Sequence, residues 1–182
     1  MVTPRLETLC TALAQVLIAR KLSMVTAESC TGGLIAASCT QLSGSSAWFE
    51  RGFVTYSNAA KSELLGVPAS LIEAQGAVSE EVAKAMALGA LAHSPAHISV
   101  AVTGIAGPTG GTDAKPVGTV WLAWAWRDSK QVLHSETLLR QFEGTRSEVR
   151  DATAELALAH LTELVEKLVG KLLETTGKKI PT

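Results

Sequence analysis

The sequence predicts a three-layer α/β/α protein, an α/β fold in which helices cover both faces of a mixed, mainly parallel sheet. Short apolar and β-branched segments alternate with longer segments whose apolar residues recur at helical spacing. The expected order of elements is α-β-α-β-α-α-α-β-β-β-α. Strands separated by helices run parallel, whereas two strands joined by a short turn run antiparallel, so we expect both kinds of pairing in one sheet.

The first half of the chain contains five expected elements, and local signals mark several of their ends. Thr3 suits a helix cap and Pro4 suits the first helical position. Asn58 is expected to cap a later helix that Gly66 ends. In order, the elements are a helix over residues 3–20, a strand over 23–27, a helix over 34–42, a strand over 48–56 and a helix over 58–65.

The second half contains a hairpin and ends in a long helix. Ser79 is expected to cap one helix, and Thr145 with Glu148 has the spacing of a capping box that opens the last helix. The remaining elements are a short helix over 68–74, a strand over 97–102, two hairpin strands over 118–126 and 131–142, and a final helix from residue 145.

Length and composition indicate one globular domain over residues 1–176, with a frayed tail over 177–182. Apolar residues make up 47% and charged residues 18%, which is enough to bury a core. The net charge of -1 gives no electrostatic reason to expect nucleic acid as a partner. No signal peptide or membrane-length apolar run is present, so we expect a cytoplasmic location and no membrane partner.

The cysteines and histidines do not indicate a metal site or a disulfide framework. Cys10, Cys30 and Cys39 are odd in number and contain no CxxC pair. His93 and His97 have helical spacing, but the proline between them breaks the helix that would align their rings. We therefore expect no metal and no cofactor.

Ser29 is the first candidate for chemistry, because it lies where a strand turns into a helix. Ligands of α/β sheets bind beyond the carboxyl ends of strands. The backbone N–H groups of residues 30–33 at such a turn can stabilise an oxyanion or bind phosphate, and Gly32 and Gly33 let the backbone approach a ligand closely. The alternative is that Ser29 or Thr31 only caps the helix. Cys30 could itself be a nucleophile, but no histidine partner can be placed near it.

Lys61 and Tyr56 form the second candidate pair. Tyr56 ends a strand, and Lys61 lies in the first turn of the next helix, where a cation opposes the helix dipole. This local cost favours a functional reason, such as a lowered lysine pKa that suits a general base. The alternatives are a solvated surface lysine and an ordinary strand tyrosine.

A loop over residues 103–112 is rich in glycine and can offer backbone N–H groups to an anion. It has the spacing of neither a P-loop nor a dinucleotide fingerprint. The alternative is a floppy surface loop, although Pro108 and the apolar Ile105 favour an ordered one. Arg146 follows the cap of the last helix and could help to hold a phosphate. Arg140 and Arg150 are further candidates, and a solvated surface role is the alternative for all three.

Taken together, the ordered blocks closely resemble the CinA C-terminal domain family, the nicotinamide mononucleotide deamidases also called PncC-type amidohydrolases. The resemblance spans roughly residues 5–172. The blocks that carry it are AESCTGG at 27–33, GFVTYSN at 52–58 with Lys61, LLGV at 64–67, GAVS at 76–79, TGIAGP at 103–108, GGT at 110–112 and KPVGTV at 115–120.

The resemblance implies hydrolysis of nicotinamide mononucleotide to nicotinic acid mononucleotide and ammonia, with Ser29 as nucleophile and Tyr56 and Lys61 as its partners. It also implies a stand-alone form of the deamidase, a small-molecule nucleotide as the partner and a homo-oligomer. The residues expected to bind substrate are Cys30, Thr31, Gly32, Gly33, Thr103, Gly104, Gly107, Thr109, Gly110, Gly111 and Arg146. Two other functions are carried as alternatives: a non-catalytic nucleotide-binding module, and a serine amidase of broader specificity.

Overall fold

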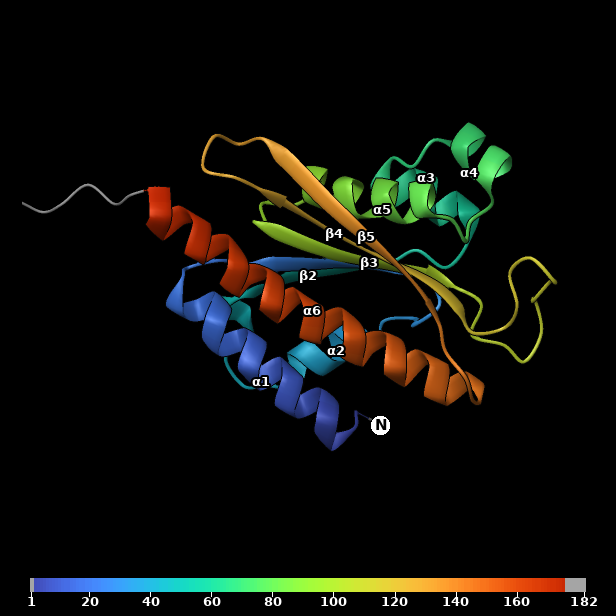
Figure 1. Ribbon diagram of the computed structural model, residues 1–182, viewed down its shortest axis with the longest axis horizontal. Helices are drawn as coiled ribbons and strands as arrows, with labels where there is room; N and C mark the ends of the chain where they lie inside the picture. Colours follow the sequence, from blue (N-terminus) through green and yellow to red (C-terminus); the bar gives the residue numbers. More distant parts are fainter. Residues whose placement is uncertain (1, 176–182) are drawn as a thin grey trace, which may run out of the picture.

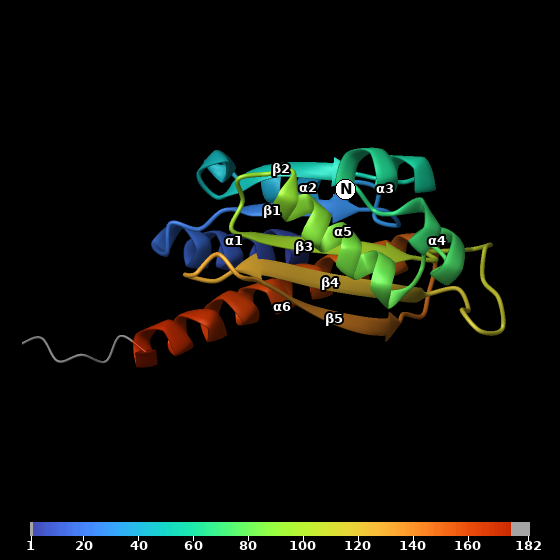
Figure 2. The same ribbon diagram turned by 90° about the horizontal axis from the view of Figure 1, so that it is seen from above.

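The computed structural model describes residues 2–175, and it has three layers around one five-stranded sheet (Figures 1 and 2). The expected α/β/α fold is confirmed. The frayed tail expected over residues 177–182 lies outside the described residues. Within the described part of the chain, no helix is both long and apolar enough to cross a membrane.

The elements follow the expected order, with one added 3-10 turn. The strands are β1 (Met24–Glu28), β2 (Phe49–Val54), β3 (Ile98–Gly104), β4 (Thr119–Arg127) and β5 (Leu133–Gln141). The helices are α1 (Pro4–Ala19), α2 (Leu34–Thr40), η1 (Ser45–Ala47), α3 (Asn58–Leu65), α4 (Ala69–Gln75), α5 (Glu80–Ala92) and α6 (Arg146–Thr175).

The sheet has the strand order β2-β1-β3-β4-β5 and is mixed. β1 pairs in parallel with both β2 and β3, whereas β3–β4 and β4–β5 are antiparallel pairs. Four of the five strands therefore run in the same direction, and only β4 runs against them. The carboxyl ends of β1, β2 and β3 consequently meet at one edge, beside the start of α3 (Figure 2).

Alternation along the central strands gives the two faces of the sheet different cores. Val120, Leu122 and Trp124 pack with α1, α2 and α6, whereas Ala123 and Ala125 belong to the cluster under α5. Small residues on the second face let α5 approach the sheet closely. α3 also packs closely against α5 at Gly89. A Cβ on this glycine would lie only 2.1 Å from the Leu65 carbonyl oxygen. Burial of both apolar faces thus fixes α3, which carries Lys61.

Most of the expected helix caps are confirmed. Thr3 accepts a hydrogen bond from Leu6 N at 3.2 Å, and Ser79 accepts one from Val82 N at 3.4 Å. Thr145 and Glu148 form the reciprocal bonds of a capping box. The cap expected at Asn58 is wrong. Ser57 has the extended backbone of a cap and accepts from Ala60 N at 3.0 Å, so Asn58 is already the first helical residue.

Candidate active site

A pocket of about 230 Å³ lies at the carboxyl ends of β1, β2 and β3. The residues that line it come from the turn after β1, the start of α3, the segment before α5, the end of β3 and the start of α6. They are Ser29, Cys30, Tyr56, Asn58, Lys61, Ala77, Val78, Thr103, Gly104, Ala106 and Arg146. The sheet therefore places five separate stretches of sequence around one cavity, as the rule for open α/β sheets predicts.

Ser29 and Lys61 are in direct contact inside this pocket. Lys61 Nζ lies 3.0 Å from Ser29 Oγ, which is hydrogen-bond distance. Lys61 also donates to the backbone carbonyls of Thr55 at 3.0 Å and Tyr56 at 3.4 Å. These contacts aim the amine at the serine, because the two carbonyls that follow β2 hold Nζ from the other side.

Burial lowers the pKa of Lys61 below its ordinary value of 10.5. The side chain is 1% exposed, and within residues 2–168 no carboxylate forms a salt bridge with it. A buried amine without a counter-ion favours the neutral form, and a neutral amine can accept a proton. The alternative of a solvated surface lysine is therefore wrong.

Burial shifts the pKa of Cys30, the neighbour of Ser29, in the opposite direction from that of Lys61. Burial raises the pKa of its thiol to about 12. A thiol with this pKa stays protonated at neutral pH and is a poor nucleophile. The pocket therefore contains a serine beside a buried amine and a cysteine whose thiol pKa is raised.

The turn between β1 and α2 leaves a backbone donor free next to Ser29 in the pocket. Ser29 N donates to Val102 O at 3.0 Å, and Gly32 N donates to Ser29 O at 3.1 Å. The N–H groups of Cys30, Thr31 and Gly33 donate to no oxygen in the described range 2–175, and of these three residues only Cys30 lines the pocket. The unpaired Cys30 N–H group, on the residue after Ser29, has the position that suits an oxyanion at this serine.

Tyr56 and Arg146 meet at the mouth of the pocket. Arg146 donates to the Tyr56 hydroxyl at 3.0 Å and to the Gly107 carbonyl at 2.9 Å. Tyr56 is 61% exposed, and its hydroxyl contacts the arginine and not Ser29 or Lys61. Tyr56 touches Lys61 only through its backbone carbonyl.

Residues 6–165 match the family model described as the CinA C-terminal domain. The chain belongs to the CinA C-terminal domain family. It is 52% identical over 159 residues to "Nicotinamide-nucleotide amidohydrolase PncC" of Pseudomonas putida, which covers 87% of this chain and 96% of that relative. The protein of the same name from Escherichia coli K12 is 48% identical over 149 residues, covering 82% of this chain and 88% of the relative.

Solved structures of the CinA family have the same fold. The competence/damage inducible protein CihA of Agrobacterium tumefaciens matches with a TM-score of 0.81 and 42% identity, over 93% of this chain and 98% of that one. A CinA superfamily protein of Klebsiella pneumoniae 700603 matches with a TM-score of 0.83 and 38% identity, over 89% and 98% of the two chains.

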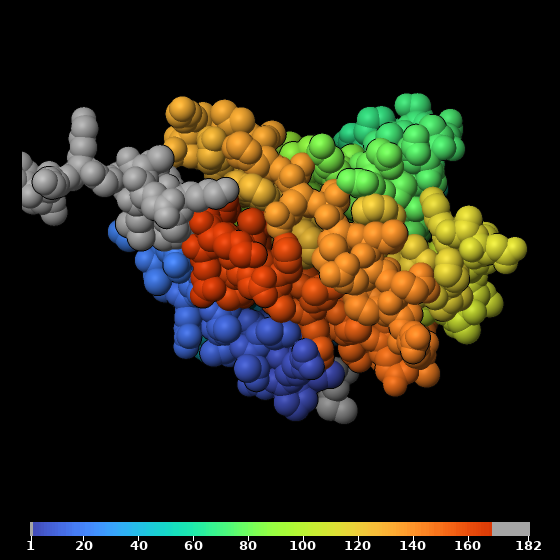
Figure 3. Space-filling model, in the orientation of Figure 1, coloured from blue at the N-terminus to red at the C-terminus, as the bar shows by residue number. Residues whose placement is uncertain are grey.

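The CinA fold brings only some of the expected site residues into the pocket. Those that line it are Ser29, Cys30, Tyr56, Lys61, Thr103, Gly104 and Arg146. Those outside the lining are Thr31, Gly32, Gly33, Gly107, Thr109, Gly110 and Gly111. The loop that carries the last three projects away from the body of the domain (Figures 1 and 3). The Gly107 carbonyl is held by Arg146, so this residue supports the mouth of the pocket from behind.

The other two arginine candidates lie elsewhere in the CinA domain. Arg150 donates twice to the Thr31 carbonyl, at 3.2 Å and 2.7 Å, and so holds the turn that carries Ser29. Arg140 lies on the edge strand β5 and donates to the carbonyl of its neighbour Leu139. Neither arginine lines the pocket.

Sequence reasoning missed four lining residues and one supporting residue of this CinA site. Asn58, Ala77, Val78 and Ala106 line the pocket. Asn58 could have been found, because it precedes Lys61 by three residues on the same helix and so shares its face. Nothing in the sequence alone distinguishes Ala77, Val78 and Ala106 from ordinary small or apolar residues.

Glu28, the missed supporting residue, holds the start of α2. Its buried carboxylate accepts from Thr31 Oγ1 at 2.7 Å, Ile35 N at 3.0 Å and Ala36 N at 2.8 Å. Glu28 thus accepts hydrogen bonds from two N–H groups in the first turn of α2. Neither Ser29 nor Thr31 accepts a bond from these groups. The alternative that Ser29 is merely a helix cap is therefore wrong.

We expect Glu28→Ala to lower the free energy of unfolding by about 2–5 kcal/mol, because it leaves two buried N–H groups without an acceptor. Urea denaturation measures this loss. Glu81→Ala is the matched control, since Glu81 lies exposed in the first turn of α5. Equal losses in the two variants would show that Glu28 contributes only its charge near a helix end.

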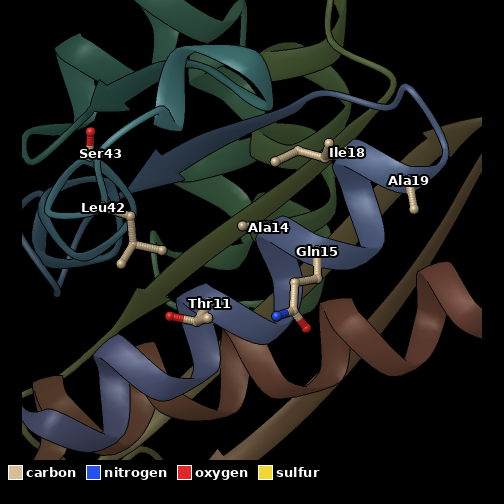
Figure 4. A pocket seen from close by; sticks show the side chains of 7 residues that line it. All are labelled: Thr11, Ala14, Gln15, Ile18, Ala19, Leu42 and Ser43. Atoms are coloured by element: carbon tan, nitrogen blue, oxygen red, sulfur yellow. The ribbon is translucent and has the colours of Figure 1, made fainter.

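Two further features of the described residues lie outside the Ser29 pocket: the histidines and cysteines, and a hollow beside α1. Within the residues that the structure describes, no group of three or more His, Cys, Asp or Glu side chains could hold a metal ion. A hollow between α1 and the turn after α2 is lined by Thr11, Ala14, Gln15, Ile18, Ala19, Leu42 and Ser43 (Figure 4). This hollow lacks an ionisable side chain, so acid–base chemistry cannot be placed there.

Proposed function

We propose that this chain hydrolyses the carboxamide of nicotinamide mononucleotide to nicotinic acid mononucleotide and ammonia, with Ser29 as the nucleophile. The observation that carries the proposal is the buried Lys61 amine 3.0 Å from Ser29 Oγ. A serine is a weak nucleophile unless an adjacent base accepts its proton, and Lys61 fits that need. The names of the curated relatives, nicotinamide-nucleotide amidohydrolases at about half identity, support the reaction class and the substrate.

The first half of the reaction forms an ester. Lys61 accepts the hydroxyl proton as Ser29 Oγ attacks the carboxamide carbon. The free N–H group of Cys30 stabilises the negative oxygen that develops on that carbon. The C–N bond then breaks, and the Lys61 ammonium gives its proton to the departing nitrogen, which leaves as ammonia. The acyl group remains on Ser29.

The second half repeats the same proton transfers with water. Lys61, neutral again, accepts a proton from a water molecule that attacks the ester carbon. The tetrahedral intermediate collapses, Ser29 Oγ recovers the proton from Lys61, and the carboxylic acid leaves. Each step uses a group of the chain, so the proposal calls for no metal or organic cofactor. Tyr56 acts in this scheme as a positioner, because its carbonyl aims Lys61 and its hydroxyl holds Arg146.

The decisive experiment for this function is ammonia release from nicotinamide mononucleotide by the purified protein, with nicotinic acid mononucleotide identified by mass. Binding without ammonia release would instead favour a non-catalytic nucleotide-binding module. Comparable turnover of simple esters and amides would favour a serine amidase of broader specificity. The homo-oligomer and the cytoplasmic location stay predictions, which size measurements in solution and cell fractionation can address.

The substrate phosphate is proposed to bind at the mouth of the pocket, with Arg146 and the start of α6. Arg146 lines the pocket and lies in the first turn of α6, where the helix dipole favours an anion. The sequence also predicts donors from the loop over residues 103–112, which includes Thr109, Gly110 and Gly111. Because these three lie outside the lining, Arg146 carries the proposal.

Nicotinamide riboside, which lacks the phosphate, is expected to lose roughly a hundredfold in kcat/KM, because charge-assisted contacts contribute about 1.5–3 kcal/mol each. Arg146→Ala is expected to impair the mononucleotide far more than the riboside, since the riboside makes no such contact. Steady-state ammonia assays on both substrates measure this difference. Arg140→Ala is the control, because Arg140 lies on β5 outside the pocket. Equal losses for the two substrates would mean that Arg146 only shapes the mouth.

A further inference from the structure

The segment between α4 and α5, residues 76–78, forms one wall of the Ser29 pocket and is held by a distant lysine. Ala77 and Val78 line the pocket together with Ser29. Lys115 Nζ donates to the Val78 carbonyl at 2.7 Å and to the Gln75 carbonyl at 3.1 Å. One ammonium ion thus joins Val78, the last residue of this wall, to Gln75, the residue that precedes it.

Two further side chains hold the carbonyls that lie between these ends. Ser79 Oγ donates to the Gly76 carbonyl at 2.9 Å, and Thr103 Oγ1 donates to the Ala77 carbonyl at 2.8 Å. Four successive carbonyls, from residues 75 to 78, therefore each accept a side-chain hydrogen bond. Gly76 lies at φ 78 and ψ 154, a conformation that residues with a side chain rarely adopt.

This arrangement fixes the direction of the N–H groups in the wall. In a trans peptide the N–H points away from the carbonyl of the preceding residue. The Ala77 N–H is therefore set by the bonded Gly76 carbonyl, and the Val78 N–H by the bonded Ala77 carbonyl. Neither N–H group forms a hydrogen bond within residues 2–175, although both residues line the cavity. The wall thus contains two free, oriented donors.

Among the described residues, no acidic side chain forms an ion pair with Lys115 that would explain its position. Within this part of the chain its contacts are the two wall carbonyls. The lysine is carried by the glycine-rich loop between β3 and β4, which itself projects away from the body (Figure 2). Ala106 of this loop lines the pocket, and Lys115 reaches the wall from 37 residues beyond Val78.

We propose that Lys115 is a positioning residue for the hydrolase reaction, holding the wall at residues 76–78 so that the Ala77 and Val78 N–H groups meet the substrate beside Ser29. This inference rests on the proposed function. Lys115 does not contact the substrate in this scheme, since its protons are directed at the backbone. Its loss would let the wall relax, and a shift of about 1 Å in a substrate-positioning group can cost about a hundredfold in rate.

The test compares Lys115→Met, Lys115→Arg and wild type, with Lys130→Met as the matched control. Methionine keeps the apolar stem and removes the donors, arginine keeps donors that can bind two carbonyls, and Lys130 is an exposed lysine in the turn between β4 and β5. We expect Lys115→Met to lower kcat/KM about ten- to a hundredfold, mainly through kcat, for both the mononucleotide and the riboside. Lys115→Arg should recover most of this loss, and Lys130→Met should match wild type.

A second measurement does not depend on activity. The NMR signals of the Val78 methyl groups and the Ala77 amide should shift or broaden in Lys115→Met and stay unchanged in Lys130→Met. If the wild-type protein releases no ammonia, the proposed function fails, while these signals still report whether Lys115 fixes the wall. Should Lys115→Met fail to fold, Lys115→Gln replaces it, because glutamine is neutral and too short to reach both carbonyls.

Three results would overturn the inference. Unchanged kcat/KM in Lys115→Met would show that the wall needs no anchor. A loss confined to the mononucleotide would make Lys115 a phosphate ligand, because the riboside would be spared. An equal loss of kcat/KM in Lys115→Met and Lys115→Arg, with unchanged Val78 and Ala77 signals, would show that Lys115 does not act through the wall.

Discussion

Ser29→Ala is expected to abolish ammonia release from nicotinamide mononucleotide, with a loss of at least about 10⁴-fold in kcat, as found for nucleophiles that act as a unit with their base. The alanine removes the only atom that Lys61 Nζ contacts in the pocket besides backbone carbonyls. Substrate binding should persist, because neither the Cys30 N–H group nor Arg146 depends on the hydroxyl. Steady-state ammonia assays and calorimetric binding measure the two properties separately.

Cys30→Ala is the matched control for this variant. Cys30 is the next residue along the chain and lines the same pocket, but burial raises the pKa of its thiol to about 12. The variant should therefore keep most of its activity. An active Ser29→Ala protein, or an inactive Cys30→Ala protein that is still folded, would transfer the nucleophile to Cys30 and refute the serine mechanism.

Lys61→Arg is expected to fail nearly as badly as Lys61→Met. Arginine keeps a positive charge, but it cannot lose its proton at neutral pH and so cannot act as a base. Both variants should lower kcat by about 10³-fold or more, within the range of losses found when one member of such a catalytic unit is removed. If Lys61→Arg retained activity, Lys61 would serve as electrostatic support and another group would be the base.

The pH dependence of the wild-type enzyme follows from the same amine. Burial lowers the pKa of Lys61, and the reactive form is the neutral one. Activity should therefore rise with pH through the lowered pKa and reach its plateau below the ordinary lysine value of 10.5. A profile of kcat/KM against pH measures this limb. A limb at or above the ordinary value would contradict the buried, neutral base.

Stability should change with pH in the same direction. Between the lowered pKa of folded Lys61 and the ordinary pKa of the unfolded chain, the unfolded state binds more protons. The free energy of unfolding of wild type, measured relative to Lys61→Met, should thus rise with pH across that window. Below the folded-state pKa the difference should be constant and should favour Lys61→Met, because a buried charge without a counter-ion is costly. Urea denaturation of both proteins at several pH values gives this comparison.

The sequence by itself determined the elements and predicted the pair that we propose to be reactive. Periodicity and capping residues such as Thr3 and Ser79 predict the helices, because these signals act within one or two turns of the chain. The motif blocks identified Ser29 and Lys61, and parallel strand pairing predicted that their loops meet at one edge of the sheet. These features depend on local geometry or on the order of elements, both of which the sequence contains.

The tertiary structure alone decided what surrounds that pair. The protonation state of Lys61 depends on burial by residues from several distant segments, and no local pattern reports burial of a lysine at a helix start. Nothing in the sequence distinguished Glu28, since its carboxylate meets the first-turn N–H groups of α2 only in the folded structure. Lys115 and the wall at residues 76–78 are 37 or more residues apart in sequence, so only packing of the loop against the end of α4 brings them together. Such contacts form between elements, and their physical cause is burial of both faces of the sheet, which sets where each element lies.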